Sequence, residues 1–137
     1  MQYIDIHENQ IYIRLAVTDS QDLKLLHFSA LPLHEEDLVK EAIPEGFPFL
    51  SMNLAGFDRP YERHGNKFIV TAPGYRMKYL SHSDERNEFG RLLTFHTKDE
   101  ETGVTAASSW QFYDDLPVIR TWHTVTNNGH ERSEERR

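Results

Sequence analysis

The sequence predicts an all-β protein in which two antiparallel sheets pack as a β-sandwich, with at most one short helix. Three observations support this fold class. Polar turns recur at strand-length intervals, with no regular alternation of strands and helices. Residues 104–113 alternate cleanly, so that Val104, Trp110 and Phe112 share one face. The chain has 8 Phe and 6 Tyr but only 3 Met, a balance that favours strands.

The first strands are expected near the N-terminus. Residues 11–17 are rich in β-branched and apolar side chains, residues 18–22 form a polar turn, and residues 23–28 return as the second arm of a hairpin. Residues 34–42 are the one candidate helix, because acidic residues crowd its first turn and Pro44 ends it. Residues 47–53 contain Pro48 and predict an edge strand or an extended loop.

The second half predicts more antiparallel strands. Residues 67–72 and 76–82 are expected to pair as a second hairpin around Pro73-Gly74, followed by a charged loop at 83–88. Strands at 89–97, 104–113 and 116–127 follow, separated by polar turns at 98–103 and at Asp114-Asp115. We therefore expect one β-sandwich domain over residues 1–129 and a polar tail over residues 130–137.

Charge and composition narrow the classes of partner. The net charge of −7 and the pI of about 5.6 disfavour nucleic acid and anionic membranes, but are compatible with neutral ligands such as sugars. The absence of cysteine excludes disulfides, thiolate metal sites and a cysteine nucleophile. The chain shows neither a secretory start nor an apolar stretch long enough to span a bilayer, so we expect a cytoplasmic protein.

Histidines and carboxylates are the first candidates for chemistry. The segment His34-Glu-Glu-Asp-Leu38 has Leu38 where a zinc protease needs its second histidine, and His96 and His123 are interpreted as ordinary strand residues, so no metal or cofactor is expected. Paired carboxylates are typical of glycoside hydrolases. The pairs here fall in expected turns and are interpreted as solvated: Asp84/Glu85, Asp99/Glu100/Glu101 and Asp114/Asp115.

Two features remain as candidate binding sites. Trp110 shares a face with apolar residues and is expected in the core. Trp122 shares its face with Val118 and with the polar Arg120 and Thr124, and could stack on a sugar. In the loop Gly56-Phe-Asp-Arg-Pro60, Asp58 could accept hydrogen bonds from sugar hydroxyls and Arg59 could donate them, although a plain surface turn is the competing interpretation.

Several segments, taken in order, resemble the N-terminal domain of family 36 glycoside hydrolases, which are mainly α-galactosidases. Residues 11–28 are similar to its opening hairpin, and residues 75–82 to a strand that ends in Ser-His. Residues 56–61 resemble its Gly-Asp-aromatic-Arg-x-Pro loop, but here Asp58 directly precedes Arg59 without the spacer residue. Residues 92–127 resemble a three-strand run that includes Val118-Ile-Arg-Thr-Trp122.

The resemblance implies a partial galactose-mutarotase-like supersandwich that accompanies a barrel bearing two catalytic aspartates. No counterpart of that barrel occurs among these residues, so no catalytic residue is carried over. It implies a non-catalytic domain that meets galactosides through the parent enzyme, with Asp58, Arg59 and Trp122 as substrate-binding candidates, and a homo-oligomer. Two alternatives stay open. One is a free-standing carbohydrate-binding module; the other is a mutarotase-like epimerase that would use His82, His96 or His123.

Overall fold

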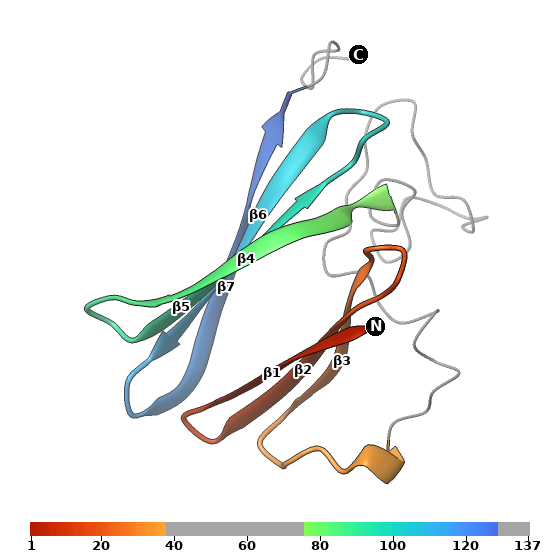
Figure 1. Cartoon of the computed structure of the whole chain (residues 1–137). Helices are drawn as coiled ribbons and strands as arrows, with labels where there is room; N and C mark the ends of the chain where they lie inside the picture. The colour runs from red at the N-terminus through yellow and green to blue at the C-terminus, as the bar shows by residue number, and fades with distance from the viewer. Residues whose placement is uncertain (38–75, 129–137) are drawn as a thin grey trace, which may run out of the picture.

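The computed structural model describes residues 1–37 and 76–128, and within them the chain forms seven strands in two antiparallel sheets (Figure 1). The N-terminal sheet has the order β1-β2-β3, and the C-terminal sheet has the order β4-β5-β6-β7. A 3-10 helix, η1 (Glu35–Asp37), follows the first sheet. The strands are β1 (Gln2–Glu8), β2 (Ile11–Val17), β3 (Leu23–Ser29), β4 (Lys78–Arg86), β5 (Arg91–Lys98), β6 (Val104–Tyr113) and β7 (Leu116–Asn127).

In the N-terminal sheet, the predicted hairpin of β2 and β3 is confirmed, and β1 is an additional strand. A two-residue turn joins β1 to β2, and both of its residues have positive φ: 50° at Asn9 and 68° at Gln10. This is the backbone of a type I′ turn, whose twist matches that of the flanking strands. The strand was missed because only Ile4 and Ile6 alternate with its polar residues, which is a short pattern.

In the C-terminal sheet, the strands predicted at 104–113 and 116–127 are confirmed as β6 and β7. The charged loop expected at 83–88 is wrong, because β4 continues to Arg86 and the turn to β5 spans only residues 87–90. The reason is a cross-strand ion pair: Arg91 donates to both carboxylate oxygens of Asp84, at 2.9 and 2.6 Å. Asp84 pairs with the buried Leu93, so this ion pair lies on the core-facing side of the sheet, at its end. Charged side chains can thus extend a ladder in a segment whose composition predicts a loop.

The two sheets bury one apolar core between them. Trp110, predicted as a core residue, lies in it and meets Phe28 of the N-terminal sheet edge to face, with ring centroids 6.0 Å apart. Side chains from both sheets interdigitate in this way in a β-sandwich. The buried apolar cluster consists of Ile6, Ile11, Ile13, Leu15, Val17, Leu23, Leu93, Phe95, Trp110 and Phe112.

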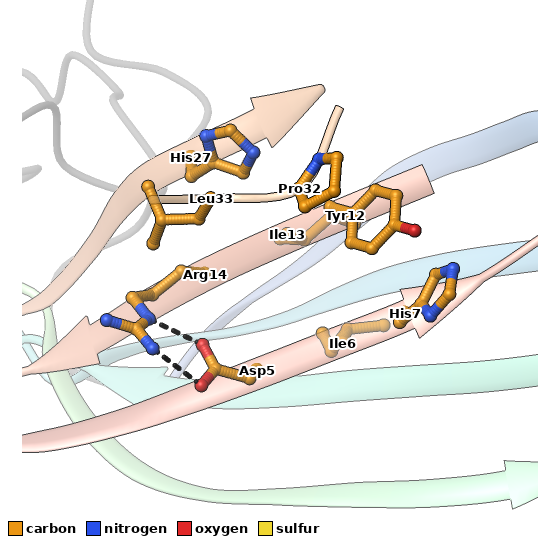
Figure 2. A pocket seen from close by; sticks show the side chains of 9 residues that line it. All are labelled: Asp5, Ile6, His7, Tyr12, Ile13, Arg14, His27, Pro32 and Leu33. Carbon is orange, nitrogen blue, oxygen red and sulfur yellow. Dashed lines mark hydrogen bonds and ion pairs between the residues drawn. The ribbon is translucent and has the colours of Figure 1, made fainter. Parts of the chain in front are cut away.

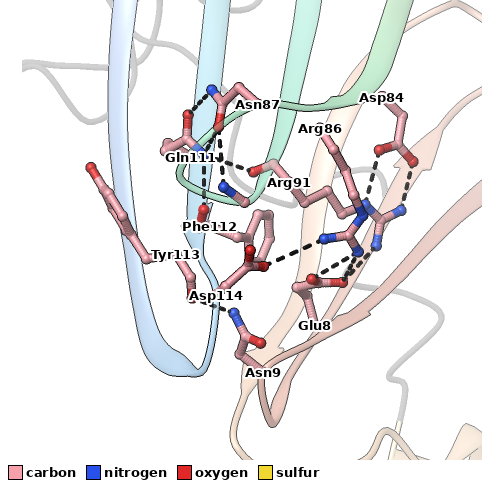
Figure 3. A network of polar contacts seen from close by, with 11 residues as sticks. Glu8, Asn9, Asp84, Arg86, Asn87, Arg91, Gln111, Phe112, Tyr113 and Asp114 are labelled. Carbon is pink, nitrogen blue, oxygen red and sulfur yellow. Dashed lines mark hydrogen bonds and ion pairs between the residues drawn. The ribbon is translucent and has the colours of Figure 1, made fainter.

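Polar contacts tie the sheets together at both ends. At one end, the Lys78 ammonium lies 2.6 Å from the Asp22 carboxylate, and the Tyr79 N–H donates to the Gln21 carbonyl at 2.7 Å. The opposite end carries a network of carboxylates, guanidinium groups and amides (Figure 3). There, Glu8 of β1 accepts from Arg86 at 3.0 Å. The core is thus closed by a polar clamp at each end.

Several predictions fall on residues outside the described ranges. These are the helix beyond residue 37, the edge segment 47–53, the strand 67–72 with its pairing to 76–82, and the tail 130–137. Residues 78–82 themselves belong to β4 and pair with β5. Among the described residues, no helix has both the length and the apolar character needed to cross a membrane.

Candidate functional site

Of the three residues predicted to bind substrate, only Trp122 lies within the described ranges, so their meeting in one site stays a prediction. Asp58 and Arg59 lie outside the described residues. Trp122 pairs with Ser109 and lies on the outer face of the C-terminal sheet, with 39% of its surface exposed. The Arg120 guanidinium lies 5.6 Å from its ring centroid. Trp122 thus offers a partly exposed aromatic ring beside a guanidinium group.

A groove of about 250 Å³ lies instead on the outer face of the N-terminal sheet (Figure 2). β1 and β2 form its floor, and the chain that follows β3 forms a wall with Pro32 and Leu33. The alternation of the strands places its polar residues opposite the core-facing isoleucines. The lining residues are Asp5, Ile6, His7, Tyr12, Ile13, Arg14, His27, Pro32 and Leu33.

An arginine held by two carboxylates occupies one end of the groove. Arg14 donates to both oxygens of Asp5, at 2.6 and 2.9 Å, and to Glu35 of η1 at 2.8 Å. The guanidinium also lies 4.6 Å from the centroid of the Tyr3 ring. The hydrogen bond to Asp5 raises the pKa of Arg14, against the opposing effect of burial, and Glu35 raises it further. Arg14 therefore stays protonated, and the carboxylates of Asp5 and Glu35 balance its positive charge.

Aromatic surface occupies the other end. The rings of His7 and Tyr12 are stacked with centroids 4.0 Å apart and an interplanar angle of 15°. His27 is held by its Nε2 atom, which lies 2.9 Å from the Leu31 carbonyl oxygen. In Figure 2, the Tyr12 and His7 rings lie side by side at the end away from Arg14. The groove therefore offers a flat apolar surface next to fixed hydrogen-bonding groups.

This combination suits a small neutral polar ligand better than an ion. Sugars present an apolar C–H face to an aromatic ring and hydroxyl groups to carboxylates and guanidinium groups. An anion would meet Asp5 and Glu35 beside Arg14, and a cation would meet Arg14 itself. The groove was missed from sequence because β1 was not recognised, so the pairing of Asp5 with Arg14 across two strands was not visible.

The three histidines proposed for an epimerase, His82, His96 and His123, do not lie together in one site. His82 and His123 share the inner face of the C-terminal sheet, and each lies 2.7 Å from a hydroxyl oxygen, of Tyr79 and Ser108 respectively. His96 lies on the outer face, paired with Ala107. Partial burial lowers the pKa of His123. Among the described residues, no group of three or more histidine and carboxylate side chains could hold a metal ion.

The candidate carboxylates are held by structural partners. Asp84 lies within β4 rather than in a turn, and its hydrogen bonds from Arg91 lower its pKa despite partial burial. Asp114 lies in the β6–β7 turn, 3.5 Å from Arg86. Figure 3 shows both acids in one network with Glu8, where the two guanidinium groups separate the carboxylates.

Asp99 corrects the expectation of a solvated turn. Its side chain is 1% exposed and accepts hydrogen bonds from Arg76 at 3.2 and 3.1 Å and from the Thr102 hydroxyl at 2.8 Å. Burial raises the pKa of Asp99, but these hydrogen bonds outweigh that effect and hold it below its usual range. The carboxylate therefore orders the β5–β6 turn as a buried, hydrogen-bonded anion.

Comparison of the sequence with protein-family models found no match, and comparison with curated proteins found none either. The functional proposal for this chain therefore rests on the geometry of its described residues and on its sequence motifs.

Proposed function

We propose that this β-sandwich is a non-catalytic domain of an α-galactosidase-like glycoside hydrolase and that it binds carbohydrate in the groove between Asp5, Tyr12 and Arg14. The observation that carries the binding is the stacked His7–Tyr12 surface beside the bidentate Arg14–Asp5 pair. The enzyme class rests on the ordered resemblance of residues 11–28, 56–61, 75–82 and 92–127 to the N-terminal domain of that family.

A non-catalytic role agrees with the state of the carboxylates. Retaining glycosidases need one carboxyl group as nucleophile and a second as acid and base, with open space between them for the sugar. Here Asp84 and Asp99 are each engaged by an arginine, and Asp99 is buried. These two carboxylates are thus held in structural ion pairs rather than facing each other across open space. We therefore expect the chain by itself to hydrolyse no α-galactoside.

Calorimetric titration of the chain with galactose and with an α-galactoside tests the proposal. We expect saturable binding that Tyr12→Ala abolishes, because the substitution removes the apolar surface, and that Asp5→Asn weakens, because it removes a charged acceptor. Trp122→Ala is the matched aromatic control and should bind as the unaltered chain does. Binding lost only in Trp122→Ala would move the site to the C-terminal sheet, and no binding at millimolar sugar would overturn the proposal.

A free-standing carbohydrate-binding module is the second candidate, because the same groove would serve it. The two candidates differ in whether a catalytic barrel is encoded in the same reading frame, which the genomic sequence following the codon for Arg137 decides. The epimerase alternative has less support, since His82 and His123 lie beside hydroxyl groups rather than opposite a carboxylate. Polarimetry of freshly dissolved α-galactose with and without the chain tests it directly.

A further inference from the structure

We propose that the edge of β7 that no other described strand covers pairs with β7 of a second copy of this chain, around a two-fold axis at Trp122, so that two four-stranded sheets become one continuous sheet. This inference concerns a different surface from the sugar groove and does not depend on the proposed function. It rests on three observations: the composition of the β7 edge, the direction of its free backbone groups, and a single register that satisfies all of them.

Among the strands that the structure describes, β7 is the sheet edge least protected against pairing. It is the longest, with 12 residues, and Arg120 is its only charged side chain. The other edge of the same sheet, β4, has 9 residues that include Lys78, Asp84, Glu85 and Arg86. Proteins that keep an edge unpaired place charges on it or shorten it. β7 is not shortened, and it carries one charge and one proline, Pro117, in 12 residues. Its exposed apolar residues are Leu116, Val118, Trp122 and Val125.

The direction of the backbone groups follows from the neighbouring ladder. The Asn128 N–H donates to the Gly103 carbonyl at 3.3 Å, which makes this a hydrogen-bonded pair of the β6–β7 ladder. Hydrogen-bonded and non-hydrogen-bonded pairs alternate in an antiparallel ladder, so the even-numbered residues of β7 from 120 to 126 bond to β6. The N–H and C=O groups on the open edge therefore belong to Ile119, Thr121, His123 and Val125.

One two-fold register pairs these four residues entirely among themselves. With the axis at Trp122, Ile119 lies opposite Val125 of the second copy, and Thr121 lies opposite His123. An axis at Thr121 would set Val125 opposite Pro117, which has no N–H to donate. An axis at Arg120 would set two arginines face to face. The register around Trp122 is therefore the one that the backbone and the charges favour.

The side chains fit this register on both faces. Trp122 meets its own copy at a non-hydrogen-bonded position, where opposing side chains approach most closely and aromatic pairs are favoured. Arg120, which already lies over the Trp122 ring, falls opposite Thr124 rather than opposite another charge. Because the axis is perpendicular to the sheet, both N-terminal sheets lie on the same side, and the pair forms one two-layer sandwich.

Sedimentation of the complete chain over a range of concentrations tests the association. We expect a monomer–dimer equilibrium that Trp122→Lys shifts at least tenfold toward monomer, because it places two like charges opposite each other at the axis. Leu80→Lys is the matched control: Leu80 is 55% exposed on the opposite edge strand of the same sheet, and this variant should associate as the unaltered chain does. A chain that remains monomeric at every concentration, with β7 left for another segment or protein, would overturn the proposal.

Disulfide trapping tests the register, and the chain has no native cysteine to interfere. Arg120→Cys and Thr124→Cys should each remain uncrosslinked alone, since like positions are about 13 Å apart along the strands, beyond disulfide reach. An equal mixture of the two variants should form a disulfide-linked dimer under mild oxidation, because the two positions face each other. A mixture that crosslinks no better than either variant alone would refute the register.

Discussion

The side-chain amide of Asn9 donates a hydrogen bond of 2.6 Å to the carbonyl oxygen of Tyr113, 104 residues further along the chain. Asn9 opens the β1–β2 turn and Tyr113 ends β6, so this one bond joins the hairpin tip of the N-terminal sheet to the β6–β7 hairpin of the C-terminal sheet (Figure 3). The residue also sits at positive φ, which asparagine tolerates better than most residues.

Substitution of Asn9 should separate these two roles. Asn9→Gly keeps the turn and removes the hydrogen bond, so we expect a loss of about 0.5–1.5 kcal/mol in unfolding free energy. Asn9→Ala keeps a Cβ in the left-handed region but lacks the polar side chain that lets asparagine adopt it, so it should be roughly 1–2 kcal/mol less stable than Asn9→Gly. Urea denaturation measures both. Equal stability of Asn9→Gly and the unaltered chain would show that the inter-sheet bond contributes nothing.

The core is expected to depend on its aromatic residues. Phe112 is fully buried in the cluster shared by both sheets, so Phe112→Ala should destabilise the fold by about 3–5 kcal/mol through lost burial and the cavity left behind. Phe89→Ala is the matched control, since Phe89 is 53% exposed, and its effect should be below about 1 kcal/mol. Thermal denaturation compares the two; similar shifts in Tm would contradict the core as described.

Gly90 is predicted to tolerate no side chain. Its φ is 151°, and a Cβ at this position would lie 2.5 Å from the Phe112 carbonyl oxygen and 3.1 Å from the Asp114 nitrogen. Because both contacts are to backbone, Gly90→Ala must displace the β6–β7 turn, and we expect a cost of about 1–3 kcal/mol. Chemical denaturation measures it, and a Gly90→Ala variant as stable as the unaltered chain would show that the turn yields freely.

The stability that Asp99 supplies should depend on pH. Its folded-state pKa is lowered, so its contribution is fully present above the unfolded value of about 4 and is lost as the pH falls through the folded value. Asp99→Asn should therefore be about 1–3 kcal/mol less stable at pH 7, with a smaller difference near pH 3. Urea titrations at both pH values give the comparison, and Glu100→Gln, on an exposed neighbour, is the control. A difference that does not change with pH would disprove the role of the carboxylate.

The strands that the sequence predicted well are those with a one-sided apolar pattern. Residues 104–113 alternate over a full strand, and β6 follows this alternation with its apolar face buried. β1 and the end of β4 were missed because they contain few apolar side chains. At the end of β4, the ladder is supported by ion pairs such as Asp84–Arg91. Such ion pairs form only in one register of the two strands, and the linear sequence does not show which residues lie opposite each other.

The candidate site was predictable only in part. The burial of Trp110 followed from its apolar neighbours on β6, whereas the mixed neighbours of Trp122 on β7 left its environment undecided. The groove required three separate facts: a β1 strand, its register with β2, and the return of residues 32 and 33 over the sheet. The last is a tertiary contact with no local signature, so residue type and spacing could not have located the pocket.

The order of the strands also determines how the molecule should fold. Each described strand pairs with its neighbour in sequence, so each sheet is a meander of hairpins that close over short loops. The bonds that join the sheets, Asn9–Tyr113 and Asp22–Lys78, instead span 104 and 56 residues. Because local hairpins close shorter loops than such distant contacts, we expect the docking of the two sheets to be the late step of folding. Weakening either clamp should then chiefly accelerate unfolding and leave the folding rate almost unchanged.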